Sequence, residues 1–322
     1  MTGEVKPSVS VVMLSYNRPA LLSEALASLR AQTCEACEVT VVDNPSAASE
    51  EVARVVGEFS DFKLVRSRSN LGYAAGMNLG LKLSSGEYTL LTEDDIVLDR
   101  DCIRSLVEYA EGDPEMGLAG PVIYNKREGT IRCAGGERSL GGIYRVKIYG
   151  EGETDRGQFP RPFDVGYVDG AVVFARTEFL RAVGGFREEF FMYGESVELC
   201  ERVAKAGARM TTVPGAKVHH FEPPPRANSS SEFSFHRYKN LFSLYLLHAP
   251  ARHLPEFFAR YALLGLLRAL AGRGGEVRPL LRALCWSARR APALLKERFN
   301  GGRNAAPYPL ACREVSSGNR RG

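Results

Sequence analysis

Three consecutive acidic residues carry the clearest sign of chemistry in this sequence. Glu93, Asp94 and Asp95 follow the apolar segment 88–91, whose composition predicts a buried strand. Carboxylates crowded at the end of a strand repel one another unless a cation neutralises them. Ligands of open α/β sheets bind at this carboxyl edge. The run therefore indicates a divalent-metal site that receives a phosphorylated substrate, and the alternative is an ordinary solvated acidic turn.

The segments around the acidic run must position it, and they alternate between strand and helix patterns. Short β-branched apolar runs are separated by stretches with apolar residues at helical spacing. The predicted strands are 8–15, 38–42, 63–66 and 88–91, and the predicted helices are 19–29, 49–58 and a stretch ending near Gly86. This rhythm predicts an α/β fold with a mostly parallel sheet flanked by helices. The first strand is not followed by GxGxxG and there is no P-loop motif, which disfavours a dinucleotide-binding Rossmann site and a P-loop nucleotidase.

Composition bounds the class of protein. The chain has 322 residues, 44% of them hydrophobic, which suits one large domain with an extension or two domains. Its seven cysteines are scattered, with one CxxC at Cys34 and Cys37, and this favours a reduced protein over a disulfide framework. The N-terminus lacks a signal-peptide pattern, and no long uncharged apolar run predicts a membrane-spanning helix. We therefore expect a cytoplasmic location.

Charge divides the chain into two parts. Residues 1–235 contain 26 basic and 34 acidic residues, whereas residues 236–322 contain 16 basic and 4 acidic ones. Leu- and Arg-rich helical patterns predict a basic helical extension over 236–300, followed by a disordered tail at 301–322. The extension either lies peripherally on the anionic inner face of the plasma membrane, or packs on the main domain or in a homodimer. Its charge alone would permit nucleic-acid binding, but no motif supports that partner.

Five blocks occur in an order and spacing that resemble glycosyltransferase family 2, which has the GT-A fold, and in particular its rhamnosyltransferase branch. Each block alone is weak, and the resemblance covers about residues 9–240. The blocks are SYNR at 15–18, VVDN at 41–44, NLGYAAGMN at 70–78, EDD at 93–95, and a longer block from VDGA at 168–171 to the histidines at 219–220. The resemblance implies a GT-A domain at 1–235, with a Rossmann-like nucleotide-sugar half at about 1–110 and an acceptor half at 111–235.

The resemblance also implies an activity, the inverting, metal-dependent transfer of a sugar from a nucleoside-diphosphate donor to an acceptor hydroxyl. The sugar would be rhamnose or another hexose or deoxysugar, and the acceptor a lipid-linked glycan or a natural-product scaffold. The donor-binding positions that the matching blocks imply are Ser15, Tyr16, Asn17, Arg18, Asp43, Asn70, Gly72, Gly76, Asn78, Glu93, Asp94 and Gly170.

Several of these assignments leave a structural alternative open, which for Tyr16 and Asn17 is ordinary loop chemistry. Asp43 ends the second predicted strand, where its carboxylate would accept a hydrogen bond from a pyrimidine N–H. The alternative is an Asx turn made with Asn44 and Pro45. Gly72 and Gly76 would let the backbone approach a ligand closely, or they would serve a tight turn and a helix start.

The metal ligands are implied by two matches to the family. Asp95 matches the final aspartate of the family's DxD-type motif, and His220 matches a histidine that follows a Pro-x-Ala turn. The resemblance therefore implies Mg²⁺ or Mn²⁺ at Asp95 and His220, although a lone histidine is often structural. The motif departs from the family pattern because it begins with Glu93, which we expect to face the ribose or a metal-bound water.

The catalytic base is where the match to the family is incomplete. Inverting members use the aspartate of a Glu-Asp pair, but this chain has Glu195 followed by Ser196. Serine cannot accept the proton near neutral pH, so the candidates are Glu195 first, then Glu198 and Asp169. The two glutamates would share one face of a helix, and the alternative for both is a structural role as charges at its N-terminus. The substitution leaves open a catalytically impaired homologue that only binds nucleotide sugars.

Overall fold

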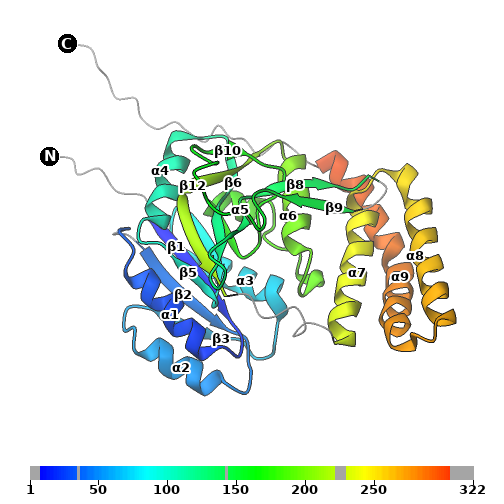
Figure 1. Cartoon of the computed structure of the whole chain (residues 1–322), viewed down its shortest axis with the longest axis horizontal. Coiled ribbons are helices and arrows are strands. Elements are labelled where there is room, and N and C mark those ends of the chain that lie inside the picture. The colour runs from blue at the N-terminus through cyan, green and yellow to red at the C-terminus, as the bar shows by residue number, and fades with distance from the viewer. Residues whose placement is uncertain (1–7, 35–36, 142–143, 222–229, 305–322) are drawn as a thin grey trace, which may run out of the picture.

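The computed structural model describes residues 8–34, 37–141, 144–221 and 230–304, and a ten-stranded sheet lies at its centre (Figure 1). The main path of the sheet is β10-β12-β6-β11-β4-β1-β2-β3, while β5 pairs with β12 and β7 with β6. The strands are β1 (Val9–Ser15), β2 (Cys37–Asp43), β3 (Lys63–Arg66), β4 (Tyr88–Glu93), β5 (Ile96–Leu98), β6 (Met116–Asn125), β7 (Ile131–Cys133), β10 (Phe163–Asp164), β11 (Val172–Arg176) and β12 (Arg209–His220). A second, two-stranded sheet pairs β8 (Gly136–Ser139) with β9 (Arg145–Ile148).

The helices cover both faces of the large sheet because the order in which strands are added reverses after β3. From β1 to β3 each new strand is added on one side of β1, and β4 is then added on the other side of β1. Right-handed crossovers therefore place α1 and α2 on one face and α3 on the opposite face. The helices are α1 (Pro19–Arg30), α2 (Ser49–Gly57), α3 (Gly72–Leu83), α4 (Cys102–Gly112), α5 (Thr177–Ala182), α6 (Glu195–Lys205), α7 (Ser231–His248), α8 (Leu254–Leu270) and α9 (Gly274–Asn304), with short 3-10 turns at Glu188–Phe190 and Ala251–His253.

The first four strands are parallel, and their carboxyl ends meet at one edge. Every residue of β1 is buried, as its β-branched apolar composition predicts. In the register of the sheet, Ser15 pairs with Asp43 and Leu14 pairs with Glu93. The expected mostly parallel α/β architecture is thereby confirmed, and it brings three separate sequence blocks to the same edge.

The second half of the sheet is mixed, and it adds a histidine to that edge. Strand β11 runs antiparallel to β4, and β12 pairs with both β6 and β5. Because β5 directly follows the acidic turn, its pairing with β12 sets His220 opposite Ile96. The backbone N–H of Phe221 donates to the carbonyl of Asp95 at 2.9 Å. Two segments more than a hundred residues apart in the sequence therefore meet at the acidic run.

The C-terminal helices form a separate layer at one end of the molecule (Figure 1). Helix α7 begins at Ser231, where the Ser230 side chain accepts a hydrogen bond from the Phe233 N–H, so the expected division after residue 235 falls inside this helix. Helix α7 packs against α9 and also contacts α6. Helix α9 extends through residues 301–304, and the remainder of the expected tail, 305–322, lies outside the described residues.

None of the helices in the described ranges combines the length and the apolar composition that crossing a membrane requires.

Candidate active site

The three acids of the run have different surroundings, which the sequence did not distinguish. Glu93 is the last residue of β4, and Asp94 and Asp95 form the turn that follows. Asp94 is buried, and its Oδ2 accepts hydrogen bonds from the Ser15 hydroxyl and the Tyr16 N–H, both at 2.9 Å. Asp94 therefore holds the loop after β1 in place, together with Ser15, and neither side chain points into an open site.

Glu93, Asp95 and His220 form a cluster with the chemistry of a metal site. One ligand atom from each residue lies within 4.8 Å of the others. The Nε2 of His220 is 3.3 Å from the Oδ1 of Asp95. Both Asp95 Oδ1 and His220 Nδ1 are buried without a hydrogen-bond partner in the described part of the chain. Carboxylates suit both Mg²⁺ and Mn²⁺, and the imidazole favours Mn²⁺ over the oxygen-preferring Mg²⁺, so these residues fit the expected cofactor.

Electrostatics at the cluster also favour a bound cation. Burial raises the pKa of Glu93 to about 8, with a further contribution from the charge of Asp95, and burial raises the pKa of Asp94 to about 7. Burial opposes ionisation of Asp95 too, but His220 and then Arg18 hold the pKa of Asp95 below its ordinary value. The guanidinium of Arg18 contacts Asp95 directly and lies 3.5 Å from Asp94. The guanidinium of Arg18 therefore already places a positive charge at this edge of the sheet.

The loop between β1 and α1 borders the acidic cluster. Tyr16 is 49% exposed, which is unusual for a large aromatic residue beside a buried cluster. Asn17 has a φ of 61°, in the left-handed region. This strained backbone places Arg18 over the acids, and such strain is common at functional sites.

Asp43 lies at the same edge, fully buried at the end of β2. Its carboxylate accepts hydrogen bonds from Arg66 Nε at 2.9 Å and from the Ser49 hydroxyl at 3.4 Å. Burial raises the pKa of Asp43, against the opposing effects of Ser49 and Arg66. These partners replace the Asx turn that was the structural alternative for this residue.

The glycine-rich segment is packed against protein. The Oδ1 of Asn70 accepts from the Gly72 N–H at 2.8 Å. Gly72 has a φ of +73°, and a Cβ there would lie 2.5 Å from the ring of Phe191. A Cβ on Gly76 would lie 2.5 Å from Leu14 Cδ1. The tight turn and the close packing of α3 on β1 therefore account for both glycines.

Two buried asparagines hold this segment to its neighbours. The Nδ2 of Asn78 donates to the Phe186 carbonyl at 2.8 Å, and its Oδ1 accepts from the Phe186 N–H at 2.9 Å. Asn78 thus fixes the Gly-Gly-Phe loop instead of facing an open site. Asn44, which the sequence did not single out as a site residue, donates to the Gly72 carbonyl at 2.9 Å and accepts from the Leu71 N–H at 3.1 Å.

Glu195 has the surroundings that a general base requires. It is the first residue of α6 and is 8% exposed. Its Oε2 is buried and has no hydrogen-bond partner within the described ranges. Burial raises the pKa of Glu195 to about 7, and the charge of Asp169 adds to the effect. An acceptor hydroxyl could supply the missing hydrogen bond, and a carboxylate with this pKa could take its proton near neutral pH.

Each of the other two base candidates is paired with an arginine. Glu198 is bound by Arg202, with N–O distances of 2.7 to 3.1 Å, and by His248 Nε2 at 3.2 Å. Burial opposes ionisation of Glu198, but His248 and Arg202 lower its pKa to about 2. Asp169 pairs with Arg132 at 2.9 Å, and despite burial this arginine lowers the pKa of Asp169. Both carboxylates are therefore poor bases in this structure.

Gly170 connects the start of α6 to the sheet. A Cβ on Gly170 would lie 3.1 Å from the Cβ of Ser196, and the Gly170 carbonyl accepts a hydrogen bond from the Tyr73 hydroxyl. A side chain at position 170 would press on the helix that carries Glu195. Gly170 thus helps to fix the position of Glu195 through its packing against Ser196.

Helix α7 also supports this region. The Nδ2 of Asn240 lies 2.7 Å from the carbonyl oxygens of Met192 and Tyr193, and Lys239 Nζ donates to the Glu189 carbonyl at 2.6 Å. Tyr193 has a φ of 69°, so these hydrogen bonds hold a strained loop directly before Glu195.

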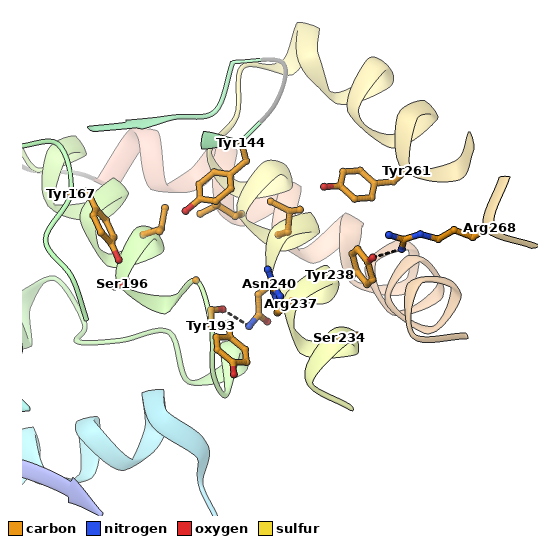
Figure 2. A pocket seen from close by; sticks show the side chains of 14 residues that line it. Tyr144, Tyr167, Tyr193, Ser196, Ser234, Arg237, Tyr238, Asn240, Tyr261 and Arg268 are labelled. Carbon is orange, nitrogen blue, oxygen red and sulfur yellow. Dashed lines mark hydrogen bonds between the residues drawn. The ribbon is translucent and has the colours of Figure 1, made fainter. Parts of the chain in front are cut away.

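A pocket of about 540 Å³ opens beside the start of α6, between α6, α7 and α8 (Figure 2). Gly194 and Ser196, the neighbours of Glu195, lie on its wall. Most of the other lining residues are aromatic or come from the C-terminal helices, and they include Tyr144, Tyr167, Tyr193, Arg237, Tyr238 and Tyr261. Sequence reasoning missed this pocket, because its walls come from segments distant in the chain.

Comparison with known protein sequences agrees with these features. The family model for glycosyl transferase family 2 matches residues 10–174. A pre-mycofactocin glycosyltransferase of Mycobacterium tuberculosis is 30% identical over 223 residues, which are 68% of this chain and 44% of the relative. This chain therefore spans less than half the length of that relative. An N-acetylglucosaminyl-diphospho-decaprenol L-rhamnosyltransferase of the same organism is 28% identical over 65% of this chain and 75% of the relative.

Solved structures agree in fold. GalNAc-T7, determined with UDP, GalNAc and Mn²⁺, has a TM-score of 0.60 at 16% identity and covers 75% of this chain and 48% of its own. The mannosyltransferase PcManGT of Pyrobaculum calidifontis, determined with GDP-Man and Mn²⁺, has a TM-score of 0.54 at 20% identity. The match covers 94% of this chain and 82% of the PcManGT chain. At these identities the likeness concerns the fold, and it confirms the expected GT-A-type architecture.

Proposed function

Because this chain belongs to glycosyl transferase family 2, we propose that it moves a sugar from a nucleoside-diphosphate donor to an acceptor hydroxyl with inversion at the anomeric carbon. The observation that carries this proposal is the buried cluster of Glu93, Asp95 and His220 at the carboxyl edge of the sheet. Two structural neighbours were determined with Mn²⁺ and a nucleotide or nucleotide sugar. Mg²⁺ or Mn²⁺ held by these three side chains would neutralise charge on the diphosphate leaving group.

The protein's own side chains have distinct roles in this proposal. Arg18, which now contacts Asp95, would turn toward the donor diphosphate. Asp43 at the end of β2, whose carboxylate is now bonded to Arg66 and Ser49, would accept a hydrogen bond from the nucleobase once the donor displaces one of these partners. Glu195 Oε2 would take the proton of the acceptor hydroxyl. The acceptor oxygen then forms the new bond to the anomeric carbon while the bond to the diphosphate breaks, and its electron pair leaves with the nucleoside diphosphate.

We further propose that the transferred group is a hexose or deoxyhexose and that the acceptor is a lipid-linked glycan or a natural-product scaffold. The rhamnosyltransferase relative, whose name specifies a diphosphate-linked lipid carrier, supports the first type of acceptor. The pre-mycofactocin relative supports the second.

A donor screen tests the proposal. UDP-, GDP- and dTDP-linked sugars, including dTDP-rhamnose, are mixed with the protein and Mn²⁺, and both the melting temperature and the released nucleoside diphosphate are measured. A ligand that binds the native form raises the melting temperature. We expect one donor to do so and to be turned over when an acceptor is present. Binding without turnover for any acceptor would instead favour the impaired homologue that Ser196 suggests, and no binding of any donor would contradict both.

One surface of α8 supports peripheral membrane contact. Leu263, Leu266, Leu267 and Leu270 are 55 to 76% exposed, and their spacing places them on one face of the helix. The surrounding C-terminal part is strongly basic, which suits an anionic lipid surface. We propose that this leucine face lies on anionic phospholipid.

Flotation with vesicles of phosphatidylglycerol tests the membrane contact. The full chain is expected to float, while Leu266→Gln combined with Leu267→Gln should remain in the dense fraction. Leu83→Gln is the control, because Leu83 is 50% exposed but lies in the sheet domain. Equal flotation of all variants would contradict the proposal, and a leucine-dependent dimer without flotation would assign the face to a second copy.

A further inference from the structure

We propose that the pocket between α6, α7 and α8 receives the acceptor through an anionic group, a phosphate or diphosphate carried by the acceptor sugar, and that Arg237 contacts this group. The inference rests on the proposed glycosyl transfer and names the class of its acceptor. The relevant observations are the charge of the pocket, its aromatic walls and its position beside Glu195.

Arg237 is an exposed cation on the wall of the pocket, and no protein group in the described part of the chain occupies its guanidinium. It lines the pocket, and within the described residues it makes neither a hydrogen bond nor an ion pair. Neighbouring arginines differ, since Arg268 donates to the Tyr238 hydroxyl and Arg282 pairs with Glu232 at 2.8 Å. A planar guanidinium with five donors matches the oxygens of a phosphate in a fork geometry.

The pocket as a whole carries positive charge. Its described lining includes two arginines and no acidic residue. An anion would therefore enter without meeting a carboxylate on the walls, whereas a cationic ligand would meet repulsion. The pocket therefore differs in charge from the acidic cluster on the donor side, which contains Glu93 and Asp95.

The walls of the pocket suit a sugar ring. Five tyrosines line it, and Figure 2 shows Tyr261 extending from α8 while Tyr144 and Tyr167 lie on the opposite side. Within the described part of the chain, the hydroxyls of Tyr144, Tyr193 and Tyr261 make no hydrogen bonds to protein. Aromatic rings pack on the apolar faces of sugars, and free phenol hydroxyls can bond to sugar hydroxyls.

Tyr193 connects the pocket to the reaction centre. Burial raises the pKa of Tyr193, and the charges of Arg237, Glu195, Glu93 and Arg18 all act on its hydroxyl. Tyr193 lies two residues before Glu195, and it lines the pocket together with Gly194 and Arg237. An acceptor whose anionic group sits on Arg237 would extend past Tyr193, with its hydroxyl directed toward Glu195.

The test measures acceptor binding directly, with the full chain held in UDP and Mn²⁺. Isothermal titration compares N-acetylglucosamine 1-phosphate, unphosphorylated N-acetylglucosamine, and a diphosphate-linked N-acetylglucosamine on a short isoprenyl chain. We expect the two phosphorylated probes to bind and Arg237→Ala to weaken them roughly 10- to 100-fold, which is typical of a lost charge-assisted contact. Arg237→Lys should retain part of the affinity, because it keeps the charge without the fork.

Arg289→Ala is the matched control, since Arg289 is exposed in the same basic part and lies outside the pocket. It is expected to bind like the unaltered chain. Equal binding of phosphorylated and unphosphorylated sugar, or unchanged affinity in Arg237→Ala, would overturn the proposal. Tighter binding of the isoprenyl probe would show that the anionic group belongs to a lipid carrier. Equal binding of both phosphorylated probes would show that it belongs to a soluble sugar phosphate. If the donor screen fails, the proposed function is contradicted, but the titration still shows whether the pocket binds a phosphorylated sugar through Arg237.

Discussion

Replacing Glu195 with glutamine is expected to lower turnover strongly and to change stability in a pH-dependent way. General-base catalysis contributes roughly 10²- to 10⁴-fold, so turnover should fall by that factor. The pKa of Glu195 is about 7 because the side chain is buried. Since only the ionised form accepts a proton, turnover of the unaltered chain should rise roughly tenfold between pH 6 and pH 8. Glu195→Gln should lack this rise.

The same burial predicts that Glu195→Gln increases the free energy of unfolding at alkaline pH. The pKa of Glu195 is raised from 4.5 to about 7, and each pKa unit corresponds to about 1.4 kcal/mol. Ionised Glu195 therefore costs the folded state roughly 3 kcal/mol above pH 7, where the group is charged in both states. Below pH 4.5 it is protonated in both states and the cost vanishes. Glu195→Gln should thus be more stable than the unaltered chain at pH 8, and little different near pH 4.5.

Glu198 provides a matched control on the same helix with the opposite sign. His248 and Arg202 overcome the effect of burial and lower the pKa of Glu198 to about 2. Its stabilisation is present above pH 4.5 and is lost as the pH falls toward 2. Glu198→Gln leaves the Arg202 guanidinium without its buried carboxylate partner, so it should lower stability by roughly 3 kcal/mol at pH 8.

Urea denaturation at pH 5 and pH 8, together with nucleoside diphosphate release, measures both effects. Stability changes of the same sign in the two variants would refute the burial argument. Unchanged turnover in Glu195→Gln would refute the assignment of the base.

Three further predictions follow from the site and its supports. Asp95→Asn or His220→Ala should abolish the rise in melting temperature that Mn²⁺ and UDP together cause, and an unchanged rise would place the cation elsewhere. Asn240→Ala should lower stability by about 1–3 kcal/mol in urea and raise the KM for acceptor, because carbonyls before α6 lose their donor. Gly72→Ala should cost roughly 2–4 kcal/mol, since the residue has φ +73° and a methyl group would meet a phenylalanine ring at 2.5 Å, whereas Gly57→Ala has open space and should be neutral or stabilising.

The strands and helices of the first half were predictable because their periodicity is local. The strand predicted at 63–66 is β3 (Lys63–Arg66), and the helix predicted at 19–29 is α1 (Pro19–Arg30). Buried β-branched runs and helical spacing encode these elements without reference to distant residues. The acidic run was found for the same reason, but its three carboxylates were not separable from sequence. A turn directs Asp94 toward Ser15 and leaves Asp95 for the cluster, and the order of residues alone does not fix that direction.

The choice among base candidates depended on partners that the sequence placed far away. Glu195 and Glu198 are both acids in the first turn of α6. His248, fifty residues beyond Glu198, ties that carboxylate to α7 and leaves Glu195 as the one with an unpartnered oxygen. Because desolvation and ion pairing set a pKa, only the packed structure distinguishes the two.

By itself, the sequence determined the alternating α/β architecture, the family, and the edge of the sheet at which an acidic cluster would lie. The tertiary structure decided which residues complete that edge. Pairing of β12 with β5 brings His220 to Asp95, and packing of α7 against α6 places Arg237 beside the neighbours of Glu195. The first contact joins residues more than a hundred positions apart in the sequence, and the second joins residues on two different helices. They arise from burial and strand pairing over the whole chain, which no local pattern records.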